Sequence, residues 1–287
     1  MKNIFQRLIV FFICLPLTLS LILLFPHFNH LLLNLVICVF SILSAVEFKN
    51  ILMQKKLVIS TPEAVIFGAL GPLSCTLVVS FGVNWLIIPI AFALGATWLF
   101  ISRLFVSAEK LESYILQITA GFAVLFYPGF FAVWMVLMAG FREASLVILI
   151  FFCIALLNDA AAWVTGMLFG KGNRGFVAAS PNKSLAGFAG GLVVSILTGV
   201  VATQLIPGAF NSPVMPSTLA GFLLGLFAGA AATIGDLSES AIKRSAEVKD
   251  SGAIILGRGG ALDSIDSLLF AAPVYFVLYQ FLFEINI

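Results

Sequence analysis

A succession of long apolar runs is the feature that most constrains how this chain can fold. The hydrocarbon core of a bilayer is about 30 Å thick, and a helix needs about 20 apolar residues to cross it. Helices are the default in lipid because a single span must satisfy its own backbone hydrogen bonds. The runs lie near residues 8–25, 31–46, 64–80, 85–101, 113–140, 145–169, 187–205, 218–235 and 267–283. They predict an all-α, polytopic integral membrane protein with about nine transmembrane helices.

The composition supports this class. The chain has 287 residues, of which 61% are hydrophobic and 10% charged, whereas soluble domains carry about 25% charged residues. Its mean hydropathy is +1.15. The formal net charge of +2 is small, and the basic residues are dispersed between apolar runs, which argues against nucleic acid as a partner. The length suits one polytopic unit and leaves no room for a separate soluble domain.

The run at 113–140 is ambiguous, because Tyr127-Pro128-Gly129 could split it into two short spans or only kink one. Lys and Arg favour the cytoplasmic side of a membrane, and their distribution favours a single span. With two spans, the basic segments that follow would be exported.

With one span, the N-terminus and the basic loops at 170–186 and 236–266 all lie inside. We therefore expect a protein of the cell (inner) membrane with a cytoplasmic N-terminus. The first run exceeds the usual length of a signal-peptide core, and no small-residue cleavage pattern follows it, so we expect it to be a retained span. Residues 47–63 are polar enough to form an interfacial linker.

The aspartates are concentrated in the second half of the chain. There are five, and none precedes residue 159: Asp159, Asp236, Asp250, Asp263 and Asp266. An acid at the middle of a span costs about 2.5–3.5 kcal/mol on insertion scales, so it favours a functional interpretation. If the stretch is helical, Asp263 and Asp266 share one face, because they are three residues apart. Converging carboxylates suit a hard cation such as Mg²⁺.

Basic residues and glycines accompany these acids. Lys243, Arg244, Lys249 and Arg258 suit phosphate oxygens, and Gly257, Gly259 and Gly260 allow the backbone to approach a ligand closely. Carboxylates for a metal, cationic side chains and a glycine-rich turn together indicate phosphoryl or nucleotidyl transfer. The alternative is a solvated loop whose charges only enforce topology. That alternative is weaker for the aspartates, because topology does not require acids.

A second polar loop has two interpretations. Lys183, with Ser180 and Ser184, precedes a helix start rich in small residues. This pattern is typical of an anion site at a helix N-terminus. It is equally typical of an interfacial lysine beside a helix cap, followed by small residues that serve helix packing.

Together the polar segments resemble a known family. The segment from Ser240 to Asp266 contains Lys243-Arg244, then Lys249-Asp250-Ser251-Gly252, then Gly257-x-Gly259-Gly260-x-Leu262-Asp263-x-x-Asp266. It resembles the signature of phosphatidate cytidylyltransferases, or CDP-diacylglycerol synthases. Three motifs earlier in the chain also resemble the family and occur in its order: Asn158-Asp159, Ser180-Pro181-x-Lys183-Ser184 with Gly187-Phe188 and Gly190-Gly191, and Gly235-Asp236-Leu237 with Glu239-Ser240. The resemblance covers about residues 158–267.

The resemblance implies an enzyme that joins CTP and phosphatidic acid into CDP-diacylglycerol, releases pyrophosphate and uses Mg²⁺, with two metal ions. By matched position, it implies that the metal is held by Asp236, Asp263 and Asp266. It implies catalytic roles for Lys243, Arg244, Lys249 and Asp250. It implies substrate contacts for Asp159, Ser180, Lys183, Ser184, Ser240, Arg258, Gly259 and Gly260.

The resemblance also implies a division of the chain into two regions. It implies that residues 1–140 are N-terminal transmembrane helices and that residues 141–287 form the catalytic region, with its site on the cytoplasmic loops 170–186 and 236–266. The expected partners are CTP, phosphatidic acid and membrane lipid, without nucleic acid. A homodimer is implied by resemblance only.

The chain departs from the family pattern at three places. Leu256-Gly257-Arg258-Gly259-Gly260 stands for the usual Pro-Gly-His-Gly-Gly, Asp263-Ser264-Ile265-Asp266 for Asp-Arg-x-Asp, and Leu185-Ala186-Gly187 for Trp-Glu-Gly. Transfer to another lipid phosphate therefore stays an alternative, as does a non-catalytic homologue. A transporter is a further alternative, but its charges should be distributed along a pathway through the spans, whereas here the acids cluster in the C-terminal half.

Overall fold

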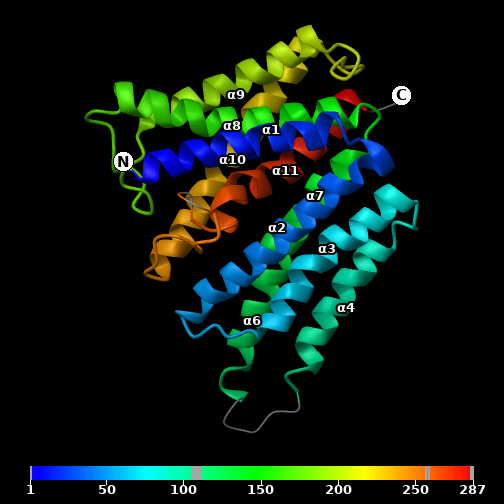
Figure 1. Ribbon diagram of the computed structural model, residues 1–287, viewed down its shortest axis with the longest axis vertical. Coiled ribbons are helices and arrows are strands. Elements are labelled where there is room, and N and C mark those ends of the chain that lie inside the picture. Colours follow the sequence, from blue (N-terminus) through cyan, green and yellow to red (C-terminus); the bar gives the residue numbers. More distant parts are fainter. Residues whose placement is uncertain (1, 105–110, 256, 258, 285–287) are drawn as a thin grey trace. The chain divides into compact units, whose positions relative to one another are not determined.

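The computed structural model describes residues 2–104, 111–255, 257 and 259–284. Helices account for every regular element in these residues (Figure 1). They are α1 (Lys2–Leu23), α2 (His27–Met53), α3 (Thr61–Phe81), α4 (Ile87–Ile101), α6 (Tyr114–Val124), the π-helical turn η1 (Leu125–Phe130), α7 (Phe131–Leu137), the 3₁₀ turn η2 (Met138–Gly140), α8 (Ala144–Phe169), α9 (Leu185–Leu205), α10 (Ser217–Ser245) and α11 (Leu262–Phe283). The all-α prediction is confirmed.

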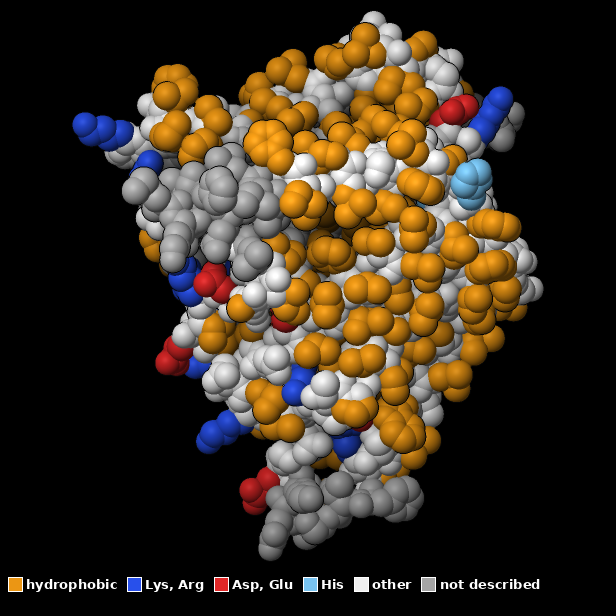
Figure 2. All heavy atoms as spheres, viewed as in Figure 1, with side chains coloured by type: hydrophobic (Ala, Val, Ile, Leu, Met, Phe, Trp, Pro, Cys, Tyr) orange, Lys and Arg blue, Asp and Glu red, His pale blue; other side chains and the backbone are white. Residues whose placement is uncertain are grey.

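Each of the nine predicted apolar runs coincides with helix. Seven helices of the described residues are long and apolar enough to cross a membrane, and Phe12–Leu23 and Ile87–Ile101 are shorter apolar helices. Hydrophobic side chains form a nearly continuous layer over α3 and α4 (Figure 2), where Ile66, Leu94 and Trp98 are more than half exposed. In water such a surface would be unfavourable, so this chain is an integral membrane protein.

The run at 113–140 forms one span. Tyr114–Gly140 is continuous helical structure of 27 residues, and the segment with Pro128 forms the π-helical turn η1 within it. Proline has no N–H to donate, so it interrupts the hydrogen-bond ladder, and a π turn is a common way to absorb the interruption. The proline distorts the span without ending it, as the charge distribution predicted.

Two predicted connections are shorter than expected. The proposed linker at 47–63 is wrong over most of its length, since α2 continues to Met53 and α3 begins at Thr61. In the same way, α10 continues to Ser245 through residues 236–245 of the predicted loop 236–266. In both places the hydrophobic run ends before the helix does, because a helix that leaves the bilayer core can carry polar residues.

The helices divide into two compact units, which are described separately. The first contains Met1–Ala139 and Ile242–Ile265, and the second contains Gly140–Ala241 and Asp266–Ile287. That residues 141–287 form the catalytic region stays a prediction. What the structure adds is that residues 242–265, the core of the motif-rich segment, belong to the same unit as α2 and α3.

In the first unit, α2 and α3 run side by side (Figure 1). Their backbones approach closely at Gly68, where any side chain would overlap Ala45 and the backbone of α2. The buried Ser41 hydroxyl lies 2.7 Å from the Gly68 carbonyl and 2.9 Å from that of Pro128. This serine therefore links α2, the helix that carries Glu47, to both α3 and the π turn.

In the second unit, a buried amide joins three helices. Asn158 of α8 is 2% exposed. Its Nδ2 donates to Ser195 Oγ of α9 (2.9 Å) and to the Gly229 carbonyl of α10 (3.2 Å), and Thr233 Oγ1 donates to its Oδ1 (3.2 Å). The amide fixes the depth and rotation of α8, and with them the position of the neighbouring Asp159.

Candidate functional site

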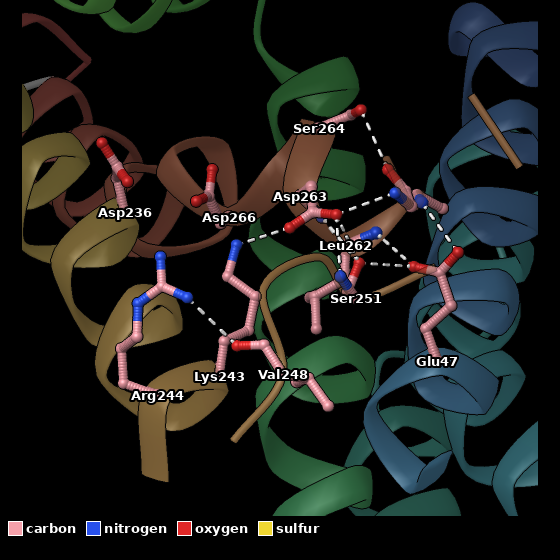
Figure 3. Close-up of polar contacts among 12 residues, drawn as sticks. Glu47, Asp236, Lys243, Arg244, Val248, Ser251, Leu262, Asp263, Ser264 and Asp266 are labelled. Carbon is pink, nitrogen blue, oxygen red and sulfur yellow. Dashed lines mark hydrogen bonds and ion pairs between the residues drawn. The ribbon is translucent and has the colours of Figure 1, made fainter. Parts of the chain in front are cut away.

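The predicted site residues fall into two groups, one in each unit. In the first unit, Lys243 near the end of α10 faces Asp263 in the first turn of α11 (Figure 3). Lys243 Nζ donates to Asp263 Oδ1 at 2.5 Å, and the two side chains are only 12% and 8% exposed. An ion pair so shielded from water is strong only when its remaining lone pairs are also satisfied.

The loop before α11 satisfies them. Asp263 Oδ2 accepts hydrogen bonds from the Gly260 N–H (2.8 Å), the Ser251 N–H (2.9 Å) and the Ser251 hydroxyl (3.0 Å). Asp263 therefore holds one oxygen toward Lys243 and the other toward the loop (Figure 3). Lys243 and the two backbone N–H groups set this orientation, the Ser251 hydroxyl adds to it when it donates to Oδ2, and the carboxylate has little rotational freedom.

Glu47 is a site residue that the sequence analysis missed. It lies on α2, is 4% exposed, and its carboxylate accepts from the Ala261 N–H, the Leu262 N–H and the Ser251 hydroxyl, each at 2.9 Å. Glu47 was missed because residues 47–63 were predicted to form a linker. The available signal was an acid directly following an apolar run, to which the argument used for the aspartates applies equally.

The glycines of the loop bring its backbone against these carboxylates. A side chain at Gly260 would overlap Glu47 Oε2 and the Ser251 hydroxyl, and one at Gly259 would overlap Asp263 Oδ2. Gly259 also has φ +110°, a conformation that side chains disfavour. In the structure these two predicted substrate-contacting residues approach carboxylates of the protein. Arg258, the third predicted contact here, lies outside the described residues.

The other predicted catalytic residues lie at the end of α10 and in the segment that follows it. Arg244, Lys249 and Asp250 are exposed, and Arg244 donates to the Val248 carbonyl at 3.2 Å. Exposed cations beside a buried ion pair are suited to meet a soluble anion.

In the second unit, Lys183 forms an ion pair with Asp236 of α10, and both side chains are more than a quarter exposed. Ser184 is 3% exposed and accepts from the Gly187 N–H at 3.0 Å, so it caps α9. The cap interpretation of this loop therefore holds for Ser184, while Lys183 points to an acid of the predicted metal site. Ser180 is half-buried, and its carbonyl accepts from the Lys183 N–H at 3.1 Å.

Two more acids of the second unit meet at one hydroxyl. Ser267 Oγ lies 3.3 Å from Asp159 Oδ2 and 3.2 Å from Asp266 Oδ1. The Ser267 N–H also donates to Asp266 Oδ1 at 2.6 Å. On α10, the absence of a side chain at Gly235 lets the helix approach the Asp266 backbone, and Ser240 lies one turn after Asp236. α8, α10 and α11 thus bring predicted site residues together.

The donor chemistry of Asp236, Asp263 and Asp266 fits a hard divalent cation, because all three offer carboxylate oxygens. Two of them already face lysines. Within each unit, the part of the chain that the structure describes contains no group of three acidic, histidine or cysteine side chains placed to share one ion. Joint metal binding by these aspartates stays a prediction.

Helices long and apolar enough to cross a bilayer define an integral membrane protein, and each unit carries a lysine–aspartate pair. A model of the cytidylyltransferase family matches residues 5–282, and this chain belongs to that family. The resemblance inferred from the motifs is confirmed.

Individual relatives match about half of this chain. The chain is 39% identical over 160 residues to phosphatidate cytidylyltransferase of Helicobacter pylori, covering 54% of this chain and 55% of the relative. It is 37% identical over 141 residues to the Bacillus subtilis enzyme of that name, covering 48% and 50%. It is 36% identical over 152 residues to the uncharacterized protein YnbB of Escherichia coli, covering 52% and 48%. The alignments span about half the length of each relative.

Proposed function

We propose that this protein is a phosphatidate cytidylyltransferase, which joins CTP and phosphatidic acid into CDP-diacylglycerol and releases pyrophosphate. The observation that carries the proposal is the pair of Lys243 and Asp263, held by the loop that contains the family motif. Relatives named phosphatidate cytidylyltransferase support the substrates.

In this reaction an oxygen of the lipid phosphate attacks the α-phosphorus of CTP. The bond from that phosphorus to the oxygen bridging the β-phosphate breaks, and pyrophosphate leaves with that bond's electron pair. Lys243 and Lys183 neutralise phosphate charge, and the exposed Arg244 and Lys249 bind the incoming polyphosphate. Asp236, Asp263 and Asp266 would hold Mg²⁺, which when bound stabilises the negative charge on the leaving pyrophosphate.

Lys243 and Lys183 each face a carboxylate that is also a proposed metal ligand. In this proposal the lysines hold the carboxylates oriented for the metal, and turn to substrate phosphates when the site is filled.

The orientation follows the positive-inside rule. The N-terminus and the basic segments at 170–186 and 236–266 lie on the cytoplasmic side of the inner membrane, where CTP is available. Assembly as a homodimer is proposed on the resemblance alone, and the mass of the purified protein in detergent tests it.

One observation favours a second lipid substrate. Ser264 stands where the family usually has arginine, and its hydroxyl donates to the Gly260 carbonyl at 3.1 Å within its own turn. This position therefore offers the lipid no cation. Transfer to a lipid phosphate other than phosphatidic acid is the runner-up.

The test uses purified protein in detergent with labelled CTP, Mg²⁺ and either phosphatidic acid or a panel of other lipid phosphates. We expect CDP-diacylglycerol and pyrophosphate in equal amounts. Product with only another lipid would select the runner-up. Absence of a CDP-lipid with every lipid phosphate would overturn the proposal.

A further inference from the structure

Glu47 stands out because its partners are far away in sequence. Its carboxylate binds Ser251, Ala261 and Leu262, which follow it by 204, 214 and 215 residues. All three donors are neutral. A buried carboxylate is costly unless hydrogen bonds satisfy it, and one loop supplies Glu47 with two backbone N–H groups and a hydroxyl.

The two amide contacts fix the start of α11. The first N–H groups of a helix have no acceptor within the helix, and negative charge is favourable at that end. Glu47 accepts from Ala261 and Leu262, directly before Asp263. A side chain on α2 thus determines where the helix with the central aspartate begins.

The third contact connects Glu47 to Asp263 through a shared hydroxyl. Ser251 Oγ lies 2.9 Å from Glu47 Oε2 and 3.0 Å from Asp263 Oδ2. A hydroxyl has one proton and donates to one carboxylate at a time. The Asp263 N–H also donates to Ser251 Oγ at 3.3 Å. Glu47, Ser251, Asp263 and Lys243 therefore form a continuous polar chain (Figure 3).

The loop backbone is shaped around the Glu47 carboxylate. A side chain at Gly252 or Gly260 would overlap it. Both ends of the loop are therefore built for close contact with this one group.

We propose that Glu47 is a positioning residue for Asp263. By holding Ser251 and the first turn of α11, it fixes the carboxylate that faces Lys243, and it does not itself touch substrate. This inference rests on the proposed function, in which Asp263 serves the transfer. A displaced Asp263 would disturb the alignment of the reacting groups more than the binding of CTP.

The experiment compares Glu47→Gln with Glu247→Gln in the full-length protein. Both substitutions remove one carboxylate. Glu247 is exposed and pairs with Lys55 at 2.8 Å, and the hydrogen bond and charge of Lys55 lower its pKa, so it is ionised at neutral pH. Two quantities are measured for each variant: the kcat and KM for CTP, and hydrogen exchange of the backbone over residues 250–262.

We expect Glu47→Gln to lower kcat by about tenfold to a hundredfold while the KM for CTP stays within about twofold. Exchange at residues 250–262 should accelerate by about tenfold, because an amide nitrogen replaces one of the two oxygens and either Ala261 or Leu262 loses its acceptor. Glu247→Gln should change neither quantity. An unchanged kcat in Glu47→Gln would overturn the inference, as would an equal fall in both variants.

Ser251→Ala keeps the inference testable if Glu47→Gln does not fold, because it removes only the shared hydroxyl. We expect it to lower kcat without raising the KM for CTP. The double variant Glu47→Gln/Ser251→Ala should lower kcat no further than the more severe single variant, because both substitutions act through the same polar chain. A kcat lowered by the product of the two single effects would contradict this.

The exchange measurement separates the two proposals. If the wild type makes no CDP-lipid, the proposed function fails, and exchange alone decides whether Glu47 holds the loop. Faster exchange in Glu47→Gln than in Glu247→Gln then supports the anchoring role, and equal exchange overturns it.

Discussion

The two lysine–aspartate pairs differ in how far water reaches them. The side chains of Lys243 and Asp263 are 12% and 8% exposed, whereas those of Lys183 and Asp236 are 29% and 28% exposed. Removing one partner of a buried pair leaves an uncompensated charge, while solvent replaces the partner of an exposed one. The same substitution should therefore have different costs at the two lysines.

We expect Lys243→Gln to lower the free energy of unfolding by about 3 kcal/mol, and Lys183→Gln by less than about 1 kcal/mol. Thermal unfolding of the purified variants in one detergent measures the difference. Both variants should lose transfer activity, because both lysines are assigned to phosphate. Equal melting temperatures would contradict the account of the buried pair.

Gly260 tests the packing of the loop on Glu47. In Gly260→Ala, the added methyl group would overlap Glu47 and Ser251. We expect a loss of about 1–3 kcal/mol in stability, as for other overpacked sites, together with most of the activity. Gly208→Ala is the matched control, since nothing lies within 4 Å of its added methyl group. Comparable melting temperatures and rates for the two variants would refute the close packing.

At the scale of elements, the helices were predictable and their ends were not. Nine apolar runs predict nine helices, because lipid demands both hydrophobicity and internal hydrogen bonding, and in the described residues seven of these helices are long and apolar enough to cross a membrane. The extension of α10 through residues 236–245 could not be predicted in this way, since hydropathy detects the bilayer and not the helix. At Pro128 the charge distribution predicted one span with a kink, but not that the kink would be a π turn.

Asn158 is the element-scale test. We expect Asn158→Ala to lower stability by about 1–2 kcal/mol, because interhelical hydrogen bonds in membranes are of this order. Activity should fall as well, since α8 carries Asp159. Thr198→Val is the control: the Thr198 hydroxyl donates to the Val194 carbonyl of its own helix at 2.8 Å. Thermal unfolding and CDP-lipid formation are compared, and a larger effect of Thr198→Val would contradict the role of Asn158.

At the scale of the whole molecule, the sidedness of the loops can be measured. In a variant whose cysteines at 14, 38, 75 and 153 are alanine, a single cysteine is placed at Lys171 or Asn211, both exposed. The positive-inside rule predicts that a membrane-impermeant maleimide labels position 211 in intact cells and position 171 only after lysis. Labelling in the opposite pattern would invert the proposed orientation.

The sequence indicated which residues belong to the candidate site, but not which of them contact one another. Aspartates and basic residues were found because charge is expensive in a membrane protein and stands out. Glu47 was missed because its role depends on contacts with residues 204 to 215 positions away, which no local pattern encodes. The pairing of Lys243 with Asp263 was missed for the same reason, because their spacing along the chain does not indicate that the two side chains meet.

The most direct test of the central claim compares the wild type with Asp263→Asn in detergent, supplied with labelled CTP, phosphatidic acid and Mg²⁺. Asparagine keeps the shape of the side chain and removes its charge. The account predicts CDP-diacylglycerol from the wild type and a loss of at least about a hundredfold in the variant, which should still fold but unfold at a lower temperature because Lys243 loses its buried partner. Equal rates of CDP-diacylglycerol formation in the two proteins would contradict it.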